Sequence, residues 1–448
     1  MTSLKDIKRV YFIGIGGVGM SALARYFLAM NIPVGGYDKS QTEISLSLEA
    51  NSCQIIYDDS PCQIHSSFLE LKGTLVIYTP AISFDNCLLA YFSEQGFTLR
   101  KRSQILGEVT KDLYCLAIAG THGKTTISSM LTFILHSNLV YCWGFLGGIA
   151  TDFNSNFIKG SSSSVVVEAD EFDRSFLQLY PDWALISSMD ADHLDIYGTQ
   201  SNLEDTFKEF TGRLKNKQII AREDLQIDAL YTYALNSDTA DFYATNIQVI
   251  QGNYCFDINY PGGICKGVRS GLPGIHNVEN AIAAFSIAFN QNISVEGIIR
   301  AISSFSGVKR RFEFHLNTAT KVYIDDYAHH PKEIELSIQS VRELFPNKML
   351  TVVFQPHLFS RTQDFMSEFA KVLSAADRVM LLDIYPAREL PIEGVSSSVL
   401  LDQISCLQKG LYKKESVVKF LLDSEVLLTL GAGDISDLIN PIKTHLLY

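Results

Sequence analysis

Short apolar runs that end in polar or glycine residues recur along the whole chain, and segments of helical periodicity separate them. Near the N-terminus this pattern predicts strands at residues 10–13, 34–37 and 74–78, with helices at about 20–30 and 88–95. Regular alternation of strands and helices is typical of open, mostly parallel sheets with helices on both faces. The first part of the chain is therefore expected to form one such α/β domain.

The same alternation continues toward the C-terminus. The middle of the chain has predicted strands at 113–119, 164–167 and 184–188, helices at 127–136 and about 204–215, and short antiparallel strands within 230–256. The last part has predicted strands at 321–324, 349–354, 379–382 and 426–430, each followed by polar residues. We therefore expect three α/β domains, which span residues 1–108, 109–313 and 314–448.

Length, composition and charge exclude several classes of protein. With 448 residues, 47% apolar and 19% charged, the chain is too long for one ordinary domain and too apolar to be disordered. Its net charge of −12 argues against nucleic-acid partners and membrane surfaces. There is no run of about 18 apolar residues, and the glycines within 14–19 argue against a signal peptide. Scattered cysteines without zinc spacing fit free thiols, so we expect a cytoplasmic protein.

One glycine-rich loop carries the most specific chemistry. The residues Gly120-Thr121-His122-Gly123-Lys124-Thr125-Thr126 lie between a predicted strand and a predicted helix. Such a loop presents backbone N–H groups and the positive end of a helix dipole to an anion. Lys124 can then reach the terminal phosphates of a nucleotide, and the Thr125 hydroxyl can bind Mg²⁺. Ile118 takes the place of the usual first glycine, so this is a shortened phosphate loop in a P-loop ATPase-type parallel sheet; the alternative is a glycine turn with a surface lysine.

A second glycine loop lies near the N-terminus. Gly14-Ile15-Gly16-Gly17-Val18-Gly19 follows strand 10–13, and Asp38 follows the next strand. This is the layout of a dinucleotide-binding fold, so the first domain is expected to be Rossmann-like. The loop alone does not specify the nucleotide, and a doubly wound fold with an unrelated ligand is the alternative. The last domain has similar strands without a phosphate loop, and we also expect it to be Rossmann-like.

Acidic residues and a histidine follow two of the central strands. Glu168 ends one apolar run, and His193 follows the next. Beside the phosphate loop, a carboxylate and an imidazole can hold Mg²⁺ together with phosphate and water. The alternative for His193 is a hydrogen-bonded histidine without a metal. Asp170, Glu171 and Asp173 fit either a metal site or a solvated acidic loop.

Ordered motifs along nearly the whole chain resemble those of the Mur ligases, the ATP-dependent amide-forming enzymes of peptidoglycan synthesis. The matching segments are 14–21, 120–126, 168–176, 192–195, 274–281, 310–313, 325–331, 354–357, 360–362 and 383–389. Within the family, the motifs are most similar to those of members that add L-alanine to UDP-N-acetylmuramate. The resemblance implies a ligase that joins these two substrates through an acyl phosphate and releases ADP and phosphate. It also implies Mg²⁺ as cofactor and a monomer or weak homodimer with these small-molecule substrates.

The resemblance assigns residues to each substrate. The implied UDP-sugar-binding residues are Gly14, Gly16, Gly17, Val18, Gly19, Met20, Ser21 and Asp38. The implied ATP-binding residues are Gly120, Thr121, His122, Gly123, Lys124, Thr125, Thr126, His276, Asn277, Asn280, Arg311 and Asp326. The implied Mg²⁺ ligands are Thr125, Glu168 and His193. The implied catalytic residues are Lys124, His193, His329 and Arg361, of which the last two match positions that meet the incoming alanine.

Two points of the implied chemistry stay open. The attacking amine must lose a proton, and His329 or His330 either accepts it or only binds the substrate. The family commonly has an arginine where this chain has Leu358, so Arg361, alone or with Arg388, is left to hold the amino-acid carboxylate.

Three other functions fit parts of the sequence. A relative in the same family attaches a preformed tripeptide to the same sugar nucleotide, but segments 168–176 and 355–357 favour alanine addition. A nicotinamide-dependent dehydrogenase would explain residues 14–38 and leave the loop at 120–126 without a role. A non-catalytic nucleotide-binding module would not need carboxylates placed as metal ligands.

Overall fold

The computed structural model describes residues 4–83, 85–190, 194–214, 216–387 and 389–447. The chain divides into two compact units. Unit 1 comprises Met1–Thr245, Ile258–Cys265 and Asn280–Ser306, and unit 2 comprises Asn246–Asp257, Lys266–Glu279 and Gly307–Tyr448. The described strands form a five-stranded, a ten-stranded and a six-stranded sheet, all rich in parallel pairs. The expected three-domain α/β fold is therefore confirmed, whereas the boundaries at 108/109 and 313/314 stay predictions.

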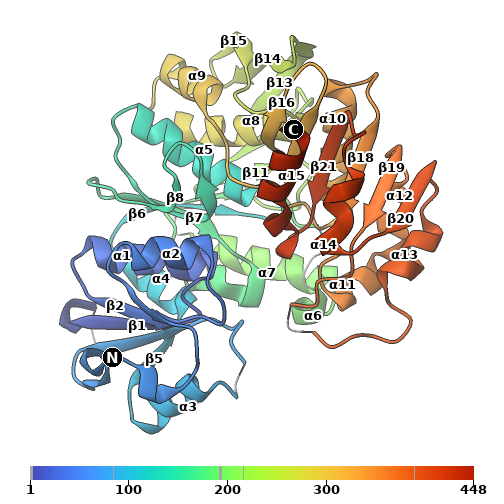
Figure 1. Ribbon diagram of the computed structural model, residues 1–448. Helices are drawn as coiled ribbons and strands as arrows, with labels where there is room; N and C mark the ends of the chain where they lie inside the picture. Colours follow the sequence, from blue (N-terminus) through green and yellow to red (C-terminus); the bar gives the residue numbers. More distant parts are fainter. Residues whose placement is uncertain (1–3, 84, 191–193, 215, 388, 448) are drawn as a thin grey trace. The chain divides into compact units, whose positions relative to one another are not determined.

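The first sheet lies in unit 1 and is parallel throughout its described strands. Its strands are β1 (Arg9–Ile13), β2 (Val34–Tyr37), β3 (Gln54–Ile56), β4 (Thr74–Tyr78) and β5 (Thr98–Lys101), in the order β3-β2-β1-β4-β5. Its helices are α1 (Val18–Ala29), α2 (Glu43–Glu49), α3 (Cys87–Glu94) and α4 (Arg102–Thr110). Alternate β1 residues face opposite sides, so Val10 and Phe12 pack toward α1, while Tyr11 and Ile13 pack toward α3. Figure 1 shows α1 and α3 on opposite faces of this sheet. The strand order reverses at β1, which places the glycine loop at a typical ligand-binding point.

The central sheet is built around the phosphate-loop strand. Its strands are β6 (Tyr114–Ala119), β7 (Trp143–Ala150), β8 (Ser155–Ile158), β9 (Ser164–Ala169), β10 (Trp183–Ile186), β11 (Ile219–Arg222), β12 (Tyr231–Ala234), β13 (Phe242–Ile250), β14 (Asn253–Tyr260) and β15 (Gly263–Arg269). Its helices are α5 (Lys124–Ser137), α6 (Leu194–Tyr197), α7 (Gln200–Gly212), α8 (Ile275–Phe289) and α9 (Val295–Ser304). In the order β15-β14-β13-β12-β11-β10-β6-β9-β7-β8, β6 lies between β10 and β9. The carboxyl ends of these three parallel strands therefore meet at one edge.

One sequence-based expectation for this sheet is wrong for strand β12. Residues 230–256 were expected to form antiparallel strands, but β12 pairs in parallel with both β11 and β13. The segment between β11 and β12 runs back to the amino-terminal end of β11 without forming a helix. The sequence therefore lacks the helical periodicity by which a parallel crossover is usually recognised.

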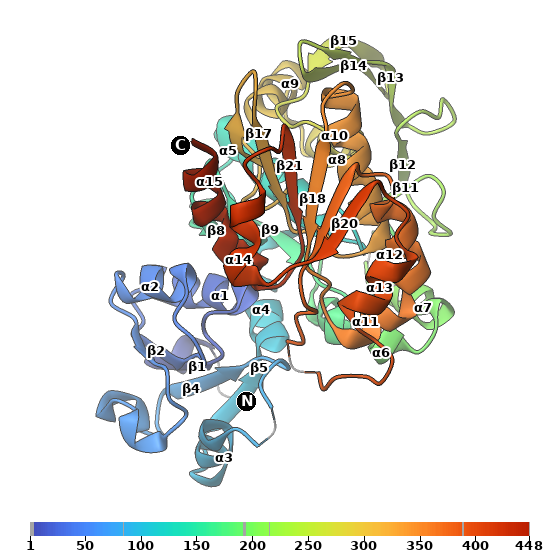
Figure 2. The ribbon, with the colours of Figure 1, turned by 45° about the vertical axis from the view of Figure 1, so that its right-hand side comes forward.

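The third sheet lies in unit 2. Its strands are β16 (Glu313–Asn317), β17 (Val322–Asp326), β18 (Leu350–Phe354), β19 (Arg378–Leu381), β20 (Gln408–Leu411) and β21 (Val426–Leu430), in the order β16-β17-β21-β18-β19-β20. The helices are α10 (Pro331–Leu344), α11 (Phe359–Asp364), α12 (Met366–Leu373), α13 (Ser397–Gln403), α14 (Lys414–Val417) and α15 (Ile439–Leu447). All pairs are parallel except β16 with β17. Helices α10, α12 and α13 cover one face, and α14 and α15 cover the other (Figure 2).

No helix within the described ranges is both long enough and apolar enough to cross a bilayer.

Candidate active site

The phosphate loop joins β6 to α5 in unit 1. Gly120 and Gly123 have φ angles of 134° and 80°, which glycine adopts readily and other residues rarely do. A side-chain carbon on Gly120 would lie 2.2 Å from Ser187 Oγ, and one on Gly123 would lie 2.7 Å from Asn280 Oδ1. Both glycines therefore permit close approach, and Asn280 of α8 lies against the loop. Because α5 begins at Lys124, its N-terminal amides and positive dipole end lie at the loop.

The Lys124 ammonium group contacts a carboxylate and a backbone carbonyl oxygen. Lys124 Nζ lies 2.8 Å from Glu171 Oε2 and donates to Gly120 O at 2.5 Å. The Lys124 side chain is 13% exposed and that of Glu171 only 1%. Burial by itself lowers the pKa of Lys124, but the neighbouring carboxylates, Glu171 above all, outweigh this effect and raise the pKa. The loop therefore holds a buried cation, for which a nucleotide phosphate would compete with Glu171.

Two oxygen groups of the kind that Mg²⁺ prefers lie beside the loop. Thr125 Oγ1 donates to Glu168 Oε1 at 3.0 Å, and Gly147 N donates to Glu168 Oε2 at 2.8 Å. A hydroxyl and a carboxylate this close fit Mg²⁺ that takes its remaining ligands from phosphate and water. Among the residues with described placement, no three His, Cys, Asp or Glu side chains gather as a metal-binding group. His193, the third predicted ligand, lies outside the described residues.

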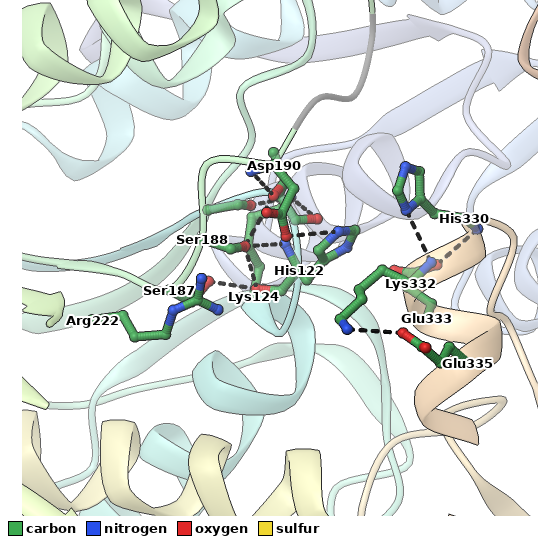
Figure 3. A network of polar contacts seen from close by, with 12 residues as sticks. His122, Lys124, Ser187, Ser188, Asp190, Arg222, His330, Lys332, Glu333 and Glu335 are labelled. Carbon is green, nitrogen blue, oxygen red and sulfur yellow. Dashed lines mark hydrogen bonds and ion pairs between the residues drawn. The ribbon is translucent and has the colours of Figure 1, made fainter. Parts of the chain in front are cut away.

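The end of β10 supports the phosphate loop. Ser188 Oγ accepts a hydrogen bond from His122 N at 2.7 Å and lies 2.9 Å from Thr121 Oγ1. Ser187 Oγ donates to His122 O. Asp190 N donates to Thr121 Oγ1 at 3.1 Å, and the Asp190 carboxylate lies 3.4 Å from His122 Nε2. This network, shown in Figure 3, fixes the middle of the loop through side chains that follow a neighbouring strand.

The glycine loop of the first domain joins β1 to α1. Gly16 N donates to Asp38 Oδ2 at 2.7 Å, so Asp38 is bonded to the loop backbone. The positive end of the α1 dipole lies at this loop and favours an anion. The first turn of α1 carries no acidic side chain that would repel an anion. Met20 and Ser21 of this turn are 2% and 0% exposed, and their side chains lie in the protein interior.

Arg102 links the glycine loop to the end of β9. A side-chain carbon on Gly19 would lie 2.6 Å from Arg102 Nη1, so the guanidinium lies against the first turn of α1. Arg102 Nη2 is 3.2 Å from Asp170 Oδ2, and Lys101 Nζ is 2.9 Å from Asp173 Oδ2. The sequence left these two aspartates open between metal ligation and a solvated loop. Their ion pairs with the first domain support a third role, in which they connect the two domains.

In unit 2, Asp326 lies at the carboxyl end of β17. It is 6% exposed and accepts hydrogen bonds from Ser337 Oγ at 2.6 Å and Ala328 N at 3.1 Å. Burial raises the pKa of Asp326 to about 6, although the two hydrogen bonds act in the opposite direction. The Arg311 guanidinium carbon lies 5.0 Å from the centre of the Tyr327 ring.

Replacing Asp326 by asparagine should therefore stabilise the nucleotide-free protein at pH 8. The folded state holds the Asp326 proton more tightly than the unfolded state, so stability falls as pH rises from the unfolded pKa to the folded pKa. An asparagine removes this penalty, by about 1–3 kcal/mol, and can still accept from Ala328 N. Thermal unfolding should show a higher Tm for Asp326→Asn at pH 8 and a clearly smaller increase at pH 4.5, because most of the penalty develops above that pH. The exposed Asp402→Asn is the control; equal shifts at both pH values would contradict the prediction.

His276 and Asn277 lie in the first turn of α8. Burial lowers the pKa of His276 to about 4, so its ring is neutral at physiological pH. The ring lies 6.1 Å from that of Phe312. Asn277 is 3% exposed and donates to Pro273 O at 2.6 Å. A neutral imidazole beside an aromatic ring fits the flat face of a nucleotide base.

Two adjacent histidines follow β17, and their ring nitrogens have different partners. His329 Nδ1 lies 3.0 Å from Tyr327 O, which can only accept, so this nitrogen carries the proton and Nε2 is the basic one. His330 Nδ1 accepts from Lys332 N at 3.3 Å, so in the neutral ring its proton is on Nε2. His330 is 7% exposed and packs on Phe365 at 4.8 Å between ring centres. These contacts favour His329 over His330 as a proton acceptor.

Arg361 lies in α11, beyond the end of β18. It is 8% exposed, and its Nη1 lies 3.5 Å from His357 Nδ1. The His357 ring stacks on Tyr385 at 5.6 Å and lies 6.1 Å from the His329 ring. Leu358 has a φ of 72°, which is uncommon for a leucine. These side chains gather beyond the carboxyl ends of parallel strands, where open α/β sheets bind ligands.

Models of protein families match three consecutive parts of the chain. The "Mur ligase family, catalytic domain" matches residues 9–114, the "Mur ligase middle domain" matches 118–288, and the "Mur ligase, glutamate ligase domain" matches 310–434.

Whole proteins match over the same extent. A UDP-N-acetylmuramate–L-alanine ligase of Christiangramia forsetii is 46% identical over 452 residues, with 100% of both chains covered. The crystal structure of the UDP-N-acetylmuramate-alanine ligase MurC of Thermotoga maritima superposes on this chain with a TM-score of 0.84 and 26% sequence identity. The superposition covers 97% of this chain and 98% of the Thermotoga chain. A murein peptide ligase of Psychrobacter arcticus shares the fold at 21% identity, with a TM-score of 0.74 and 98% of each chain covered. Because the first match spans the full length at this identity, the chain belongs to the Mur ligase family.

Proposed function

We propose that this chain joins L-alanine to the carboxylate of UDP-N-acetylmuramate and converts ATP to ADP and phosphate, as a step of peptidoglycan synthesis. The observation that carries this proposal is the full-length, 46% identity to a UDP-N-acetylmuramate–L-alanine ligase. The buried phosphate-loop lysine beside Glu171 supports the use of a nucleotide. The murein peptide ligase of Psychrobacter arcticus shares only the fold, at 21% identity.

The first chemical step makes the carboxylate reactive. A carboxylate oxygen of UDP-N-acetylmuramate bonds to the γ-phosphorus of ATP, the bond to the β–γ bridging oxygen breaks, and an acyl phosphate and ADP result. Phosphoryl transfer depends mainly on positioning and on neutralising charge. The Lys124 ammonium and the first amides of α5 provide donors for the phosphate oxygens. Mg²⁺ held by Thr125 and Glu168, with His193 as a further proposed ligand, would neutralise charge on the same oxygens.

The second step forms the amide bond. The amine of L-alanine attacks the acyl carbon, and the tetrahedral intermediate expels phosphate. The amine must give up a proton, and His329 Nε2 is the basic nitrogen of a ring whose other nitrogen faces Tyr327 O. Arg361 is the cation that we assign to the carboxylate of alanine, because it is buried and lies within 3.5 Å of His357 in the same group of side chains.

The other assigned residues bind the two nucleotides. The glycine loop and first turn of α1 are proposed to hold the diphosphate of the UDP-sugar, supported by a helix end without acidic residues. Asn280 is proposed to act at the phosphate end of ATP, because it lies against Gly123. His276, Asn277, Arg311 and Asp326 are proposed to bind the base, ribose and phosphates. Free thiols support a cytoplasmic protein, for which we also propose a monomer or weak homodimer.

Phosphate release with purified protein tests this function. With ATP and Mg²⁺, we expect phosphate only when both UDP-N-acetylmuramate and L-alanine are present, and a mass increase of the sugar nucleotide by one alanyl residue. Glycine, L-serine and the preformed tripeptide are tested in place of alanine. Faster turnover with the tripeptide would contradict the proposal and identify the recycling activity instead. Removal of Mg²⁺ with a chelator should stop release, and added Mg²⁺ should restore it.

A further inference from the structure

The hairpin of β7 and β8 contacts both nucleotide-binding regions of unit 1. On one side it packs against α1 of the first domain (Figure 1). Tyr26 of α1 lies 5.9 Å from Trp143, 5.8 Å from Phe145 and 6.2 Å from Phe157, measured between ring centres. On the other side, Gly147 of β7 donates to the Glu168 carboxylate. The hairpin thus lies between the helix that we assign to the UDP diphosphate and the carboxylate that we assign to Mg²⁺.

A buried polar side chain extends from this hairpin to the first turn of α1. Asn156 of β8 is 0% exposed, and its Nδ2 donates to Val18 O at 2.6 Å and to Ser21 Oγ at 2.9 Å. Ser21 Oγ in turn donates to Val18 O at 2.8 Å. Val18 is the first residue of α1 and follows the glycine loop directly. Asn156 therefore fixes the start of the helix through its backbone and not only through apolar packing.

The orientation of the Asn156 amide is determined by its neighbours. Val18 O can only accept, so the amide nitrogen must face it. The opposite atom, Asn156 Oδ1, is buried and has no hydrogen-bond partner among the residues that the structure describes. A buried acceptor without a donor is unfavourable, so the two bonds donated by Nδ2 must offset it. An apolar residue would avoid this cost but would leave Val18 O and Ser21 Oγ without these bonds.

We propose that Asn156 is a positioning residue for the sugar nucleotide, an inference that rests on the function proposed above. It holds the first turn of α1 at a fixed place relative to the phosphate-loop domain. The diphosphate of the UDP-sugar, bound at that turn, is thereby placed so that its muramyl carboxylate reaches the γ-phosphate of ATP. Displacements of about 1 Å can change rates by about 100-fold in reactions that depend on such alignment.

The proposal predicts a selective effect of Asn156→Ala. We expect kcat to fall, because the muramyl carboxylate is then misplaced relative to the γ-phosphate. We also expect the KM for UDP-N-acetylmuramate and its dissociation constant, measured by calorimetry, to rise about tenfold, because both hydrogen bonds that hold the first turn of α1 are lost. The KM for ATP and the dissociation constant of ADP should stay within about twofold, because the phosphate loop is untouched. Asn156→Asp should have a larger effect than Asn156→Ala, because a carboxylate would face the Val18 carbonyl oxygen.

Phe157→Leu is the matched control for a purely structural role. Phe157 is the next residue of β8 and packs on Tyr26, so its truncation loosens the same interface without removing the hydrogen bonds. It should lower Tm and leave the ratio of the two KM values unchanged. Equal increases of both KM values in Asn156→Ala, no increase at all, or the same selective increase in Phe157→Leu would overturn the proposal. Wild-type protein that fails to bind UDP-N-acetylmuramate would instead refute the proposed function.

Discussion

Lys124→Ala should reduce ATP-dependent phosphate release by at least about 10³-fold. The side chain supplies a buried positive charge at the N-terminus of α5, and its Nζ lies at the phosphate loop within 2.8 Å of Glu171. Without this cation, the charge that develops on the transferring phosphoryl group loses a fixed counter-charge. Steady-state phosphate release with saturating UDP-N-acetylmuramate and L-alanine measures the effect.

Loss of folding must be separated from loss of catalysis, because Lys124→Ala leaves the buried Glu171 carboxylate without its cation. Breaking a buried pair in this way typically costs about 3–5 kcal/mol. The double variant Lys124→Met/Glu171→Gln removes both charges and should recover most of the lost Tm while remaining inactive. Lys208→Ala is the control, because this lysine is 51% exposed and pairs with Asp205 on the surface. A normal rate in either Lys124 variant would refute the assignment of the phosphate loop.

Strands bounded by polar residues could be predicted from the sequence alone. The predicted strands 34–37, 74–78 and 426–430 coincide with β2, β4 and β21. Each is a short segment that is largely buried in a parallel sheet, and burial decreases at flanking polar residues such as Asp38 and Glu425. The phosphate loop could equally be predicted, because its glycines, lysine and threonines all lie within one short segment, residues 120–126.

The β7–β8 hairpin and the direction of β12 could not be predicted in this way. β7 contains three glycines in the segment Trp143–Ala150, so its apolar alternation is interrupted. Its stability comes from aromatic contacts with α1, more than 110 residues away along the chain, which local periodicity does not encode.

The partners of the site residues also depend on contacts between distant segments. Glu171 looked like one of several acids in a polar loop, yet it is almost fully buried against Lys124. Ser188 gave no signal as a residue that supports the loop at Thr121 and His122. Asn156 lies in a segment with no recognised motif. Its role follows only from the hydrogen bonds that it makes with Val18 and Ser21.

Arg361→Ala should raise the KM for L-alanine by about 10–100-fold, the loss expected for a charge-assisted hydrogen bond to the substrate carboxylate. Arg361 is 8% exposed and lies beside His357, and Leu358 stands where the resemblance to the Mur ligases implies an arginine. The effect should therefore be larger than in relatives that have both cations. The KM for ATP should stay within about twofold, because no ATP residue is removed.

Initial rates measured at varied alanine with both other substrates saturating will test this prediction, together with Tm as a check on folding. Arg361→Lys keeps the charge but loses the planar fork of donors, so it should restore only part of the affinity for alanine. Arg378→Ala is the matched control. Arg378 is also a largely buried arginine of unit 2, but it lies at the amino-terminal end of strand β19, away from the carboxyl ends of the strands, and pairs with Asp423 at 2.9 Å. Equal increases in the KM values of alanine and ATP in Arg361→Ala would show that the residue maintains the domain and does not bind the amino-acid carboxylate.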